Sequence, residues 1–269
     1  MLSSSFFHSI LLATTFCFPS ALATAESDFD WRTLHASKTL HWTPCYSAPL
    51  QCTLLQVPMD YNAPRNGVTA SIAIVRYPST SPKSQYRGPL LFNPGGPGGS
   101  GVDAIVGAGA DFATAFGEQF DVVGFDPRGV SYSTPTISFF KTEAERRFLI
   151  PSATNVLYAS FNASSVSLAD TYANMQLMGQ LAIENDPNGY LQHMSTDNIA
   201  RDMLSITEAF GFEKLQYWGV SYGSVLGATF ATLFPDKVGR LIITICQRKI
   251  KEKKIAACHS FGQRFNFLA

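Results

Sequence analysis

Charged residues are scarce in this sequence, and neither sign of charge prevails. They make up 15% of the 269 residues, with 20 Lys and Arg against 20 Asp and Glu. The formal net charge is therefore +0, and no overall charge attracts a nucleic acid or an anionic membrane surface. A repeat of fixed period is also lacking, which excludes solenoids and propellers. The 46% of hydrophobic residues is typical of a globular chain, long enough for one large domain with a sizeable core.

Long apolar runs are lacking too, so we expect no stable membrane span. The apolar run near the N-terminus, residues 10–18, is short for a bilayer crossing. Small residues follow at alternate positions, Ala21-Leu-Ala23, as signal peptidase requires. The residues before the run contain no Lys or Arg, and a buried N-terminal helix or a membrane anchor is the alternative. We predict that residues 1–25 are a signal peptide and that the protein is secreted.

Cysteine is infrequent, and its spacing does not fit a zinc site. The leader would remove one of the five cysteines, and neither remaining pair has zinc spacing with a histidine. Cys45 and Cys52 flank a Ser-Ala-Pro turn, so an oxidising compartment would allow a small-loop disulfide; two free thiols are the alternative. Asn162 begins an N-glycosylation sequon, which matters only in a secreted chain. We expect neither a metal ion nor an organic cofactor.

Short apolar strands alternate with helical patterns along the chain. This alternation predicts an α/β fold, with a mostly parallel sheet covered by helices on both faces. We expect one helix to begin after Ser195 or Thr196 and to end before Gly211. Residues 29–61 look mixed and rich in turns. The predicted strands are 71–77, 89–92, 120–125, 215–218 and 240–245, and further helical patterns lie at 141–148 and 168–183.

One pentapeptide joins a predicted strand to a helical pattern in a way that suits nucleophilic catalysis. Residues 219–223 read Gly-Val-Ser-Tyr-Gly directly after the strand at 215–218. This context makes Gly-x-Ser-x-Gly specific, because the sharp turn projects the serine above the sheet. We expect Ser221 to have a strained backbone and to lie where the amide dipoles of a helix N-terminus favour negative charge. A chance pentapeptide in a strand–helix turn is the alternative.

A glycine-rich segment argues against chance. The strand at 89–92 continues into Asn-Pro-Gly-Gly-Pro-Gly-Gly-Ser-Gly at 93–101. Acyl transfer through a serine needs amide donors aimed at the developing oxyanion. Gly95 and Gly96 would let that backbone approach a substrate, and Tyr222, the residue after the serine, would supply the second donor. A phosphate-binding loop is the alternative, but the spacing is wrong and no lysine follows.

Together with a third motif, these segments resemble the α/β-hydrolase fold. The third motif is Gly-Phe-Asp-Pro-Arg-Gly at 124–129, in which we expect Asp126 and Arg128 to shape a tight turn and Asp126 to have no direct catalytic role. More narrowly, the sequence is similar to secreted tripeptidyl aminopeptidases and prolyl aminopeptidase-like serine peptidases, with further matches at 52–61, 198–202 and 234–240. The resemblance implies that Ser221 is the nucleophile, that the Gly96 and Tyr222 amides are oxyanion donors, and that substrates are peptides or small amides or esters.

The resemblance ends where an acid and a base would be required. In this fold the chain order is Ser, then Asp or Glu, then His, but the family pattern breaks at Thr244, where Asp-Gly usually follows. His259 is the only histidine after Ser221 and has no preceding core strand, so we assign neither acid nor base. Nor does the sequence rank Glu143, Glu145 and Glu184 as partners of a substrate amine. We interpret residues 246–269 as an aberrant, disordered basic tail of a truncated or mis-spliced product.

The sequence therefore leaves three functions open. The leading hypothesis is a secreted serine hydrolase, an aminopeptidase acting through an acyl-enzyme on Ser221, that is inactive as this chain stands because acid and base are absent. A non-catalytic pseudoenzyme or binding protein is the second, and an esterase on the same fold is the third. Residues 26–245 would form a partial α/β-hydrolase domain, with an inserted helical segment at about 133–195. No nucleic-acid partner is indicated.

Overall fold

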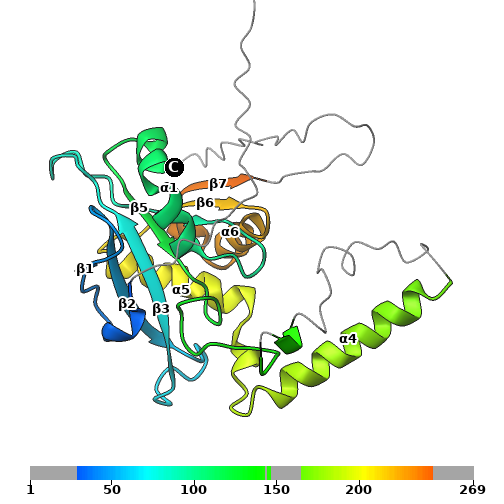
Figure 1. Ribbon diagram of the computed structural model, residues 1–269. Coiled ribbons are helices and arrows are strands. Elements are labelled where there is room, and N and C mark those ends of the chain that lie inside the picture. Colours follow the sequence, from blue (N-terminus) through cyan, green and yellow to red (C-terminus); the bar gives the residue numbers. More distant parts are fainter. Residues whose placement is uncertain (1–28, 143, 147–164, 245–269) are drawn as a thin grey trace, which may run out of the picture.

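The computed structural model describes residues 29–142, 144–146 and 165–244 of the chain (Figure 1). The predicted leader, the sequon at Asn162, Glu143 and the tail with His259 lie outside these residues. What the sequence analysis predicted for these segments stays a prediction, and so does the division of the chain into an insertion and a partial domain.

Seven strands of the described chain form one mixed sheet in the order β1-β2-β3-β5-β4-β6-β7. Four of them, β5, β4, β6 and β7, run parallel, whereas β1, β2 and β3 join this group through antiparallel pairings. The carboxyl ends of the parallel strands therefore meet at one edge, where open α/β sheets form their ligand sites. The strands are β1 (Thr43–Pro44), β2 (Gln51–Pro58), β3 (Thr69–Tyr77), β4 (Pro89–Asn93), β5 (Asp121–Phe125), β6 (Leu215–Val220) and β7 (Val238–Thr244).

Helices cover both faces of this sheet, as expected for the α/β class. In β3, Ile72 and Ile74 pack into a core shared with α5 and α6, whereas Ala73 and Val75 pack into a second core shared with α1. Alternate residues of a strand point to opposite faces, so one strand contributes to two cores. The α-helices are α1 (Gly101–Phe116), α4 (Ser167–Glu184), α5 (Thr196–Ala209) and α6 (Tyr222–Leu233), and the 3-10 helices are η1 (Trp31–Thr33), η2 (Tyr190–His193) and η3 (Pro235–Lys237).

The five strands predicted from the sequence are confirmed within about two residues at each end, but β2 is a correction. The segment at 29–61 was expected to be rich in turns, and the structure places an eight-residue strand within it, paired with β3 along its whole length. Polar Thr53 and Gln56 interrupt the apolar pattern of β2, so hydrophobic periodicity does not predict this strand. Thr53 is nevertheless buried and its hydroxyl accepts the His41 amide.

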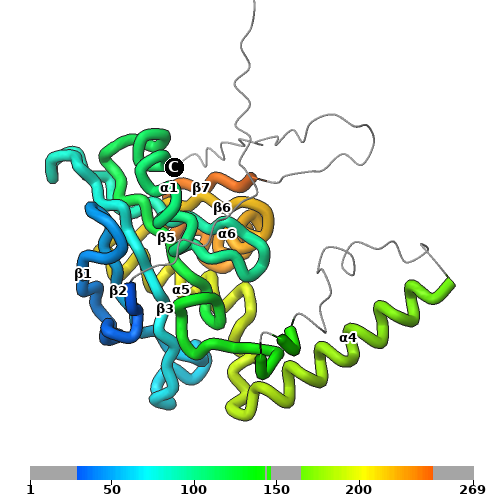
Figure 2. Tube along the Cα trace, in the orientation of Figure 1, coloured from blue at the N-terminus to red at the C-terminus, as the bar shows by residue number. Residues whose placement is uncertain are grey.

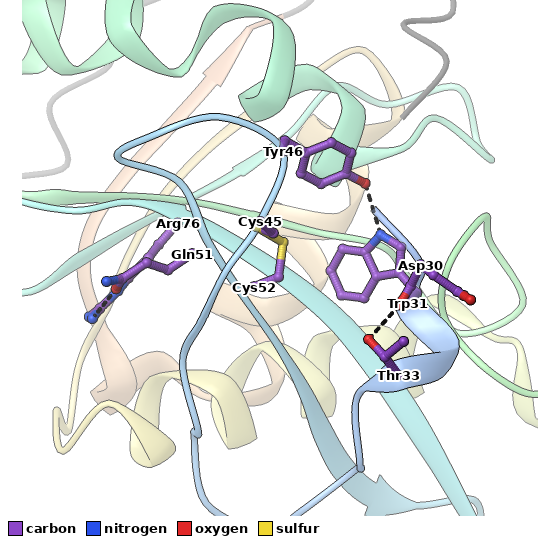
Figure 3. Close-up of a disulfide and its surroundings, with 8 residues drawn as sticks. All are labelled: Asp30, Trp31, Thr33, Cys45, Tyr46, Gln51, Cys52 and Arg76. Carbon is purple, nitrogen blue, oxygen red and sulfur yellow. Dashed lines mark hydrogen bonds between the residues drawn. A yellow bond between two sulfur atoms is a disulfide. The ribbon is translucent and has the colours of Figure 1, made fainter. Parts of the chain in front are cut away.

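Cys45 and Cys52 form a disulfide that links the segment after β1 to β2 (Figure 3). Both residues are buried, and they lie in the same core as Trp31. The Trp31 indole in turn donates to the Tyr46 hydroxyl at 2.8 Å. The cross-link thus fastens the N-terminal segment to the antiparallel edge of the sheet.

The helix α4 confirms the helical pattern at 168–183 but contributes nothing to either core. It projects from the body of the molecule (Figures 1 and 2), and none of its residues is buried. Tyr172 and Ile183 are 67% and 77% exposed. Next to its C-terminus, Asn185 donates a hydrogen bond to the Phe139 carbonyl at 3.1 Å. No helix among the described residues combines the length and the apolar character that a bilayer crossing requires.

A buried ion pair joins the turn after β5 to α5. Arg128 donates to both carboxylate oxygens of Asp202 at 2.6 and 2.7 Å, and both side chains are almost completely buried. The remaining guanidinium hydrogens reach the carbonyls of Pro58 and Met59, at and just after the end of β2, and the carbonyl of His193. The Tyr61 hydroxyl also donates to Asp202 at 2.7 Å. Arg128 therefore shapes the turn as the sequence indicated, and it ties three elements together as well.

We predict that Asp202→Ala lowers the free energy of unfolding by about 3–5 kcal/mol, because it leaves the Arg128 charge buried without its partner. Urea unfolding followed by fluorescence measures this loss. The matched control is Glu208→Gln, which removes the exposed pair with Lys237 at 3.8 Å and should cost less than about 1 kcal/mol. Equal losses of unfolding free energy in the two variants would show that the buried pair contributes no more to stability than the exposed pair.

Candidate active site

Ser221 occupies the sharp turn between β6 and α6. Its φ of 56° and ψ of −119° lie outside the regions that a serine normally adopts, so the expectation of a strained backbone is confirmed. The residue is exposed and directly precedes the first turn of α6. Strain of this kind persists only where the surroundings impose it, and it concentrates at functional sites.

The glycines beside Ser221 are required by close backbone contacts. A Cβ on Gly219 would collide with the Gly223 carbonyl oxygen. A Cβ on Gly223 would lie only 2.7 Å from the Asn93 carbonyl oxygen at the end of β4. The turn therefore needs glycine at both positions, as the pentapeptide pattern indicated, and it brings α6 against the neighbouring parallel strand.

Hydrogen bonds fix this turn to β7 and to α5. The carbonyl oxygen of Thr244 accepts from the Ser221 amide and from the Ser224 hydroxyl, both at 2.9 Å. The Tyr222 hydroxyl shares a hydrogen bond of 2.8 Å with the Thr196 hydroxyl in the first turn of α5. The sequence analysis named Thr196 only as a candidate helix start and Thr244 only as the point where the family pattern breaks, and it predicted neither of these contacts.

The glycine loop, defined here as residues 94–100, lies directly against the Ser221 turn. A Cβ on Gly95 would collide with the Val220 carbonyl oxygen and would lie 2.9 Å from the Tyr222 nitrogen and 3.0 Å from the Ser221 Cβ. Gly95 is buried, whereas Gly96 is exposed. The sheet thus brings the glycine loop and the Ser221 turn into backbone contact. The sequence analysis could only infer that these two motifs lie together.

Backbone amides remain available beside Ser221. The Gly95 amide is occupied, because it donates to Asn93 Oδ1 at 2.9 Å. Among the described residues, the amides of Gly96 and Tyr222 donate to no protein acceptor. Tyr222 begins α6, where the first amides have no partner within the helix and the dipole favours negative charge. Unpaired amides can stabilise an oxyanion that forms within hydrogen-bond distance of them.

Asp126 lies at the end of β5, close to the last residues of the glycine loop. Its Oδ1 accepts from the Ser100 hydroxyl at 2.7 Å and from the Val102 amide at 3.1 Å, and its Oδ2 accepts from the Tyr132 amide at 3.1 Å. Burial raises the pKa of Asp126 to about 6, and these three hydrogen bonds oppose the shift. Asp126 does shape the turn, as expected, and it also contacts α1.

The described residues bring neither an acid nor a base to Ser221. After Ser221 this part of the chain contains one carboxylate, the exposed Asp236 of η3, and no histidine. His35, His41 and His193 precede the turn, and no hydrogen bond joins their rings to Ser221 within the described residues. The His41 ring instead contacts the Thr39 hydroxyl at 2.9 Å. Within the same residues, no cluster of three or more His, Cys, Asp or Glu side chains could hold a metal ion.

We predict that Asp126→Asn changes how stability depends on pH. The folded-state pKa of about 6 lies above the ordinary value of 3.8, so Asp126 contributes stability that is fully present below about pH 4 and is lost as the pH rises through about 6. From about pH 3 to about pH 8, a range that contains both pKa values, the wild-type free energy of unfolding should fall by about 3 kcal/mol relative to Asp126→Asn. Urea unfolding at both pH values measures this difference. Asp111→Asn, on exposed Asp111 farther along α1, should keep the wild-type slope, and parallel lines for all three proteins would refute the assignment.

Comparison with known proteins finds relatives of similar sequence. The chain is 35% identical to serine protease Hip1 of Mycobacterium tuberculosis over 212 residues, 76% of this chain and 39% of that protein. It is 36% identical to tripeptidyl aminopeptidase of Streptomyces lividans over 229 residues, 83% of this chain and 39% of that protein. Carboxylesterase B of Mycobacterium tuberculosis is 34% identical over 163 residues, 59% of this chain and 29% of that protein. The chain thus spans well under half the length of these curated relatives.

Among solved structures, proline iminopeptidase of Mycobacterium smegmatis superimposes with a TM-score of 0.37 and 16% identity, over 70% of this chain and 42% of that one. The family model described as alpha/beta hydrolase fold matches residues 88–255, which is more than half of the chain and includes the glycine loop, Asp126 and the Ser221 turn. The chain belongs to the alpha/beta hydrolase fold family.

Proposed function

We propose that this chain carries the nucleophile and oxyanion amides of a serine hydrolase that forms an acyl-enzyme on Ser221. The observation that carries the proposal is the contact of Gly95 with the backbone at 220–222. Ser221 Oγ would attack the carbonyl carbon of a peptide, amide or ester, and the amides of Gly96 and Tyr222 would stabilise the oxyanion. The bond to the amine or alcohol then breaks, that group leaves with a proton, and water releases the acid.

The preferred substrates are peptides with a free N-terminus, from which short pieces or single residues are released. The relatives named tripeptidyl aminopeptidase and serine protease support this choice. An esterase is the second candidate, and the relative named carboxylesterase B supports it. Both reactions use the same nucleophile and oxyanion, so the site geometry alone serves either.

Turnover also requires a base that takes the proton of Ser221 and an acid that orients the base. We propose that the 269-residue chain by itself turns substrates over poorly, because the described residues after Ser221 include no histidine. Loss of such groups costs several orders of magnitude in rate and leaves only oxyanion and binding effects. A chain with no turnover at all would be a non-catalytic binding protein.

We further propose that the protein is secreted. The leader at 1–25 and the sequon at Asn162 support this, and so does the disulfide between Cys45 and Cys52, since such bonds persist in oxidising compartments. Expression with the native leader in a eukaryotic secretory host should yield a chain in the medium that begins near residue 26. Glycosidase treatment should lower its mass, whereas Asn162→Gln should abolish that shift. An intact Met1 on a chain retained in the cell would contradict the proposal.

We predict that a fluorophosphonate probe labels Ser221 in a full-length form of the protein that supplies the base, and that Ser221→Ala abolishes the label there, because the base activates the hydroxyl and the amides stabilise the oxyanion. Peptide mapping by mass spectrometry measures the modified residue. Ser131→Ala is the matched control, since Ser131 is also an exposed serine with a positive φ, of 43°, but lies in no strand–helix turn. Its removal should leave labelling unchanged.

The outcomes of this experiment separate the candidate functions. A form that supplies the base and is still not labelled at Ser221 contradicts the serine hydrolase and leaves the binding protein. If Ser221 is labelled, a tripeptide anilide and a short acyl ester compare the two substrate classes. Faster acylation by the anilide supports the aminopeptidase, and acylation by the ester alone supports the esterase.

A further inference from the structure

The glycine loop has little intrinsic means of holding one conformation. Gly95, Gly96 and Gly98 have φ values of 93°, 112° and 97°, which only glycine adopts without strain. A glycine loses more conformational entropy on ordering than any other residue. Gly96 and Gly98 are also exposed, so packing of side chains does not fix them. A loop that must present one amide at a set position therefore has to be held at both ends.

The N-terminal end of the loop is held by Asn93 and by the Ser221 turn. Asn93 is 1% exposed and accepts the Gly95 amide at 2.9 Å. Gly95 lies against the Val220 carbonyl and the Ser221 Cβ. Within the loop, the Gly99 amide donates to the Gly95 carbonyl at 3.0 Å, which closes the turn around Gly96.

The C-terminal end of the loop is held by Asp126. Ser100, the last loop residue, donates to Asp126 Oδ1 and accepts the Asp103 amide at 3.0 Å, so its hydroxyl is oriented from both sides. The Val102 amide reaches the same Oδ1, and the Tyr132 amide reaches Oδ2. Asp126 is completely buried, and a hydrogen bond to a buried carboxylate is stronger than one between neutral groups.

Close packing leaves the start of α1 no room to move toward β5. A Cβ on Gly101 would collide with the Phe125 carbonyl oxygen, and a Cβ on Gly124 would collide with the Gly101 carbonyl oxygen. The two backbones are thus in direct contact, within two residues of Asp126 at the end of β5 and one residue from Ser100 on the loop. The carboxylate supplies the hydrogen bonds that keep this contact from opening.

We propose that Asp126 is a positioning residue for the reaction at Ser221, acting through Ser100 and the Val102 amide to hold the glycine loop that carries the Gly96 amide. This inference rests on the acyl-transfer function proposed above and deepens it by assigning a role to the aspartate after β5. Asp126 touches neither substrate nor Ser221 in this role. A simple cap of α1 would order Val102 alone, whereas a positioning residue also orders Gly95 and Gly99.

Hydrogen exchange at single amides tests the proposal without any need for turnover. In Asp126→Ala, the Gly95 and Gly99 amides should exchange about tenfold faster, as expected for loss of hydrogen bonds to a buried carboxylate. Asp126→Asn should fall between this variant and the wild type, because its Oδ1 can still accept from Ser100 and Val102. Asp111→Asn, an exposed carboxylate farther along α1, is the matched control and should leave these rates unchanged. Amides of β2 report the stability of the whole molecule and should not change.

A second measurement concerns the rate at which a fluorophosphonate modifies Ser221. Asp126→Ala should lower the maximal rate of modification and leave the half-saturating probe concentration unchanged, because the loop acts on the oxyanion and not on probe binding. Ser100→Ala removes a single hydrogen bond of the set and should shift both readouts in the same direction, by less. If Asp126→Ala raises exchange throughout the molecule, the Ser100→Ala variant decides whether Asp126 holds the loop.

The result that overturns the proposal is faster exchange at Val102 with unchanged Gly95 and Gly99, which would make Asp126 a cap of α1. Unchanged exchange in Ser100→Ala, when Asp126→Ala affects every amide, overturns it as well. If Ser221 is not modified even in a form that supplies the base, the proposed hydrolase function fails, while the exchange rates still decide whether Asp126 holds the loop.

Discussion

The site depends on one close approach, that of the Gly95 backbone to the turn that holds Ser221. Any side chain at position 95 would occupy the space of the Val220 carbonyl. Because the two segments touch through backbone atoms alone, their separation is set by the sheet and varies little with side-chain conformation. On the other side of this contact, the strained φ of Ser221 and the glycines at 219 and 223 shape the turn that Gly95 approaches.

The sheet creates this approach by pairing two strands that are distant in the sequence. β4 and β6 are parallel neighbours, and Asn93 pairs in register with Gly219. Each strand therefore ends at the same level, and each continues into a helix, α1 or α6, that starts at the same edge. The helices lie on opposite faces of the sheet and pack into separate cores. The fold thus places the glycine loop and the Ser221 turn side by side, and a separate hydrophobic core holds the helix that follows each of them.

Local chemistry explains which parts of this arrangement the sequence predicted. The strands, α5 and the Ser221 turn follow from apolar periodicity and from glycines whose need is local. β2 was missed because polar Thr53 and Gln56 break its pattern. The contacts from Asp126 to Ser100 and from Arg128 to Asp202 join residues 26 and 74 positions apart. No local rule pairs such side chains, and only the assembled sheet brings them together.

Geometry and proton transfer are separable in this chain. The residues that place Ser221 and the glycine loop, among them Asn93, Gly95 and Thr244, lie within the described chain, and they hold one another through backbone contacts and buried polar groups. The groups that would move a proton are not among them. A positioned hydroxyl with unpaired amides lowers the energy of an oxyanion but does not make the hydroxyl a strong nucleophile. An active hydrolase and an inactive relative can therefore share every feature described for this site, and they would differ only in the side chains that reach Ser221 from elsewhere.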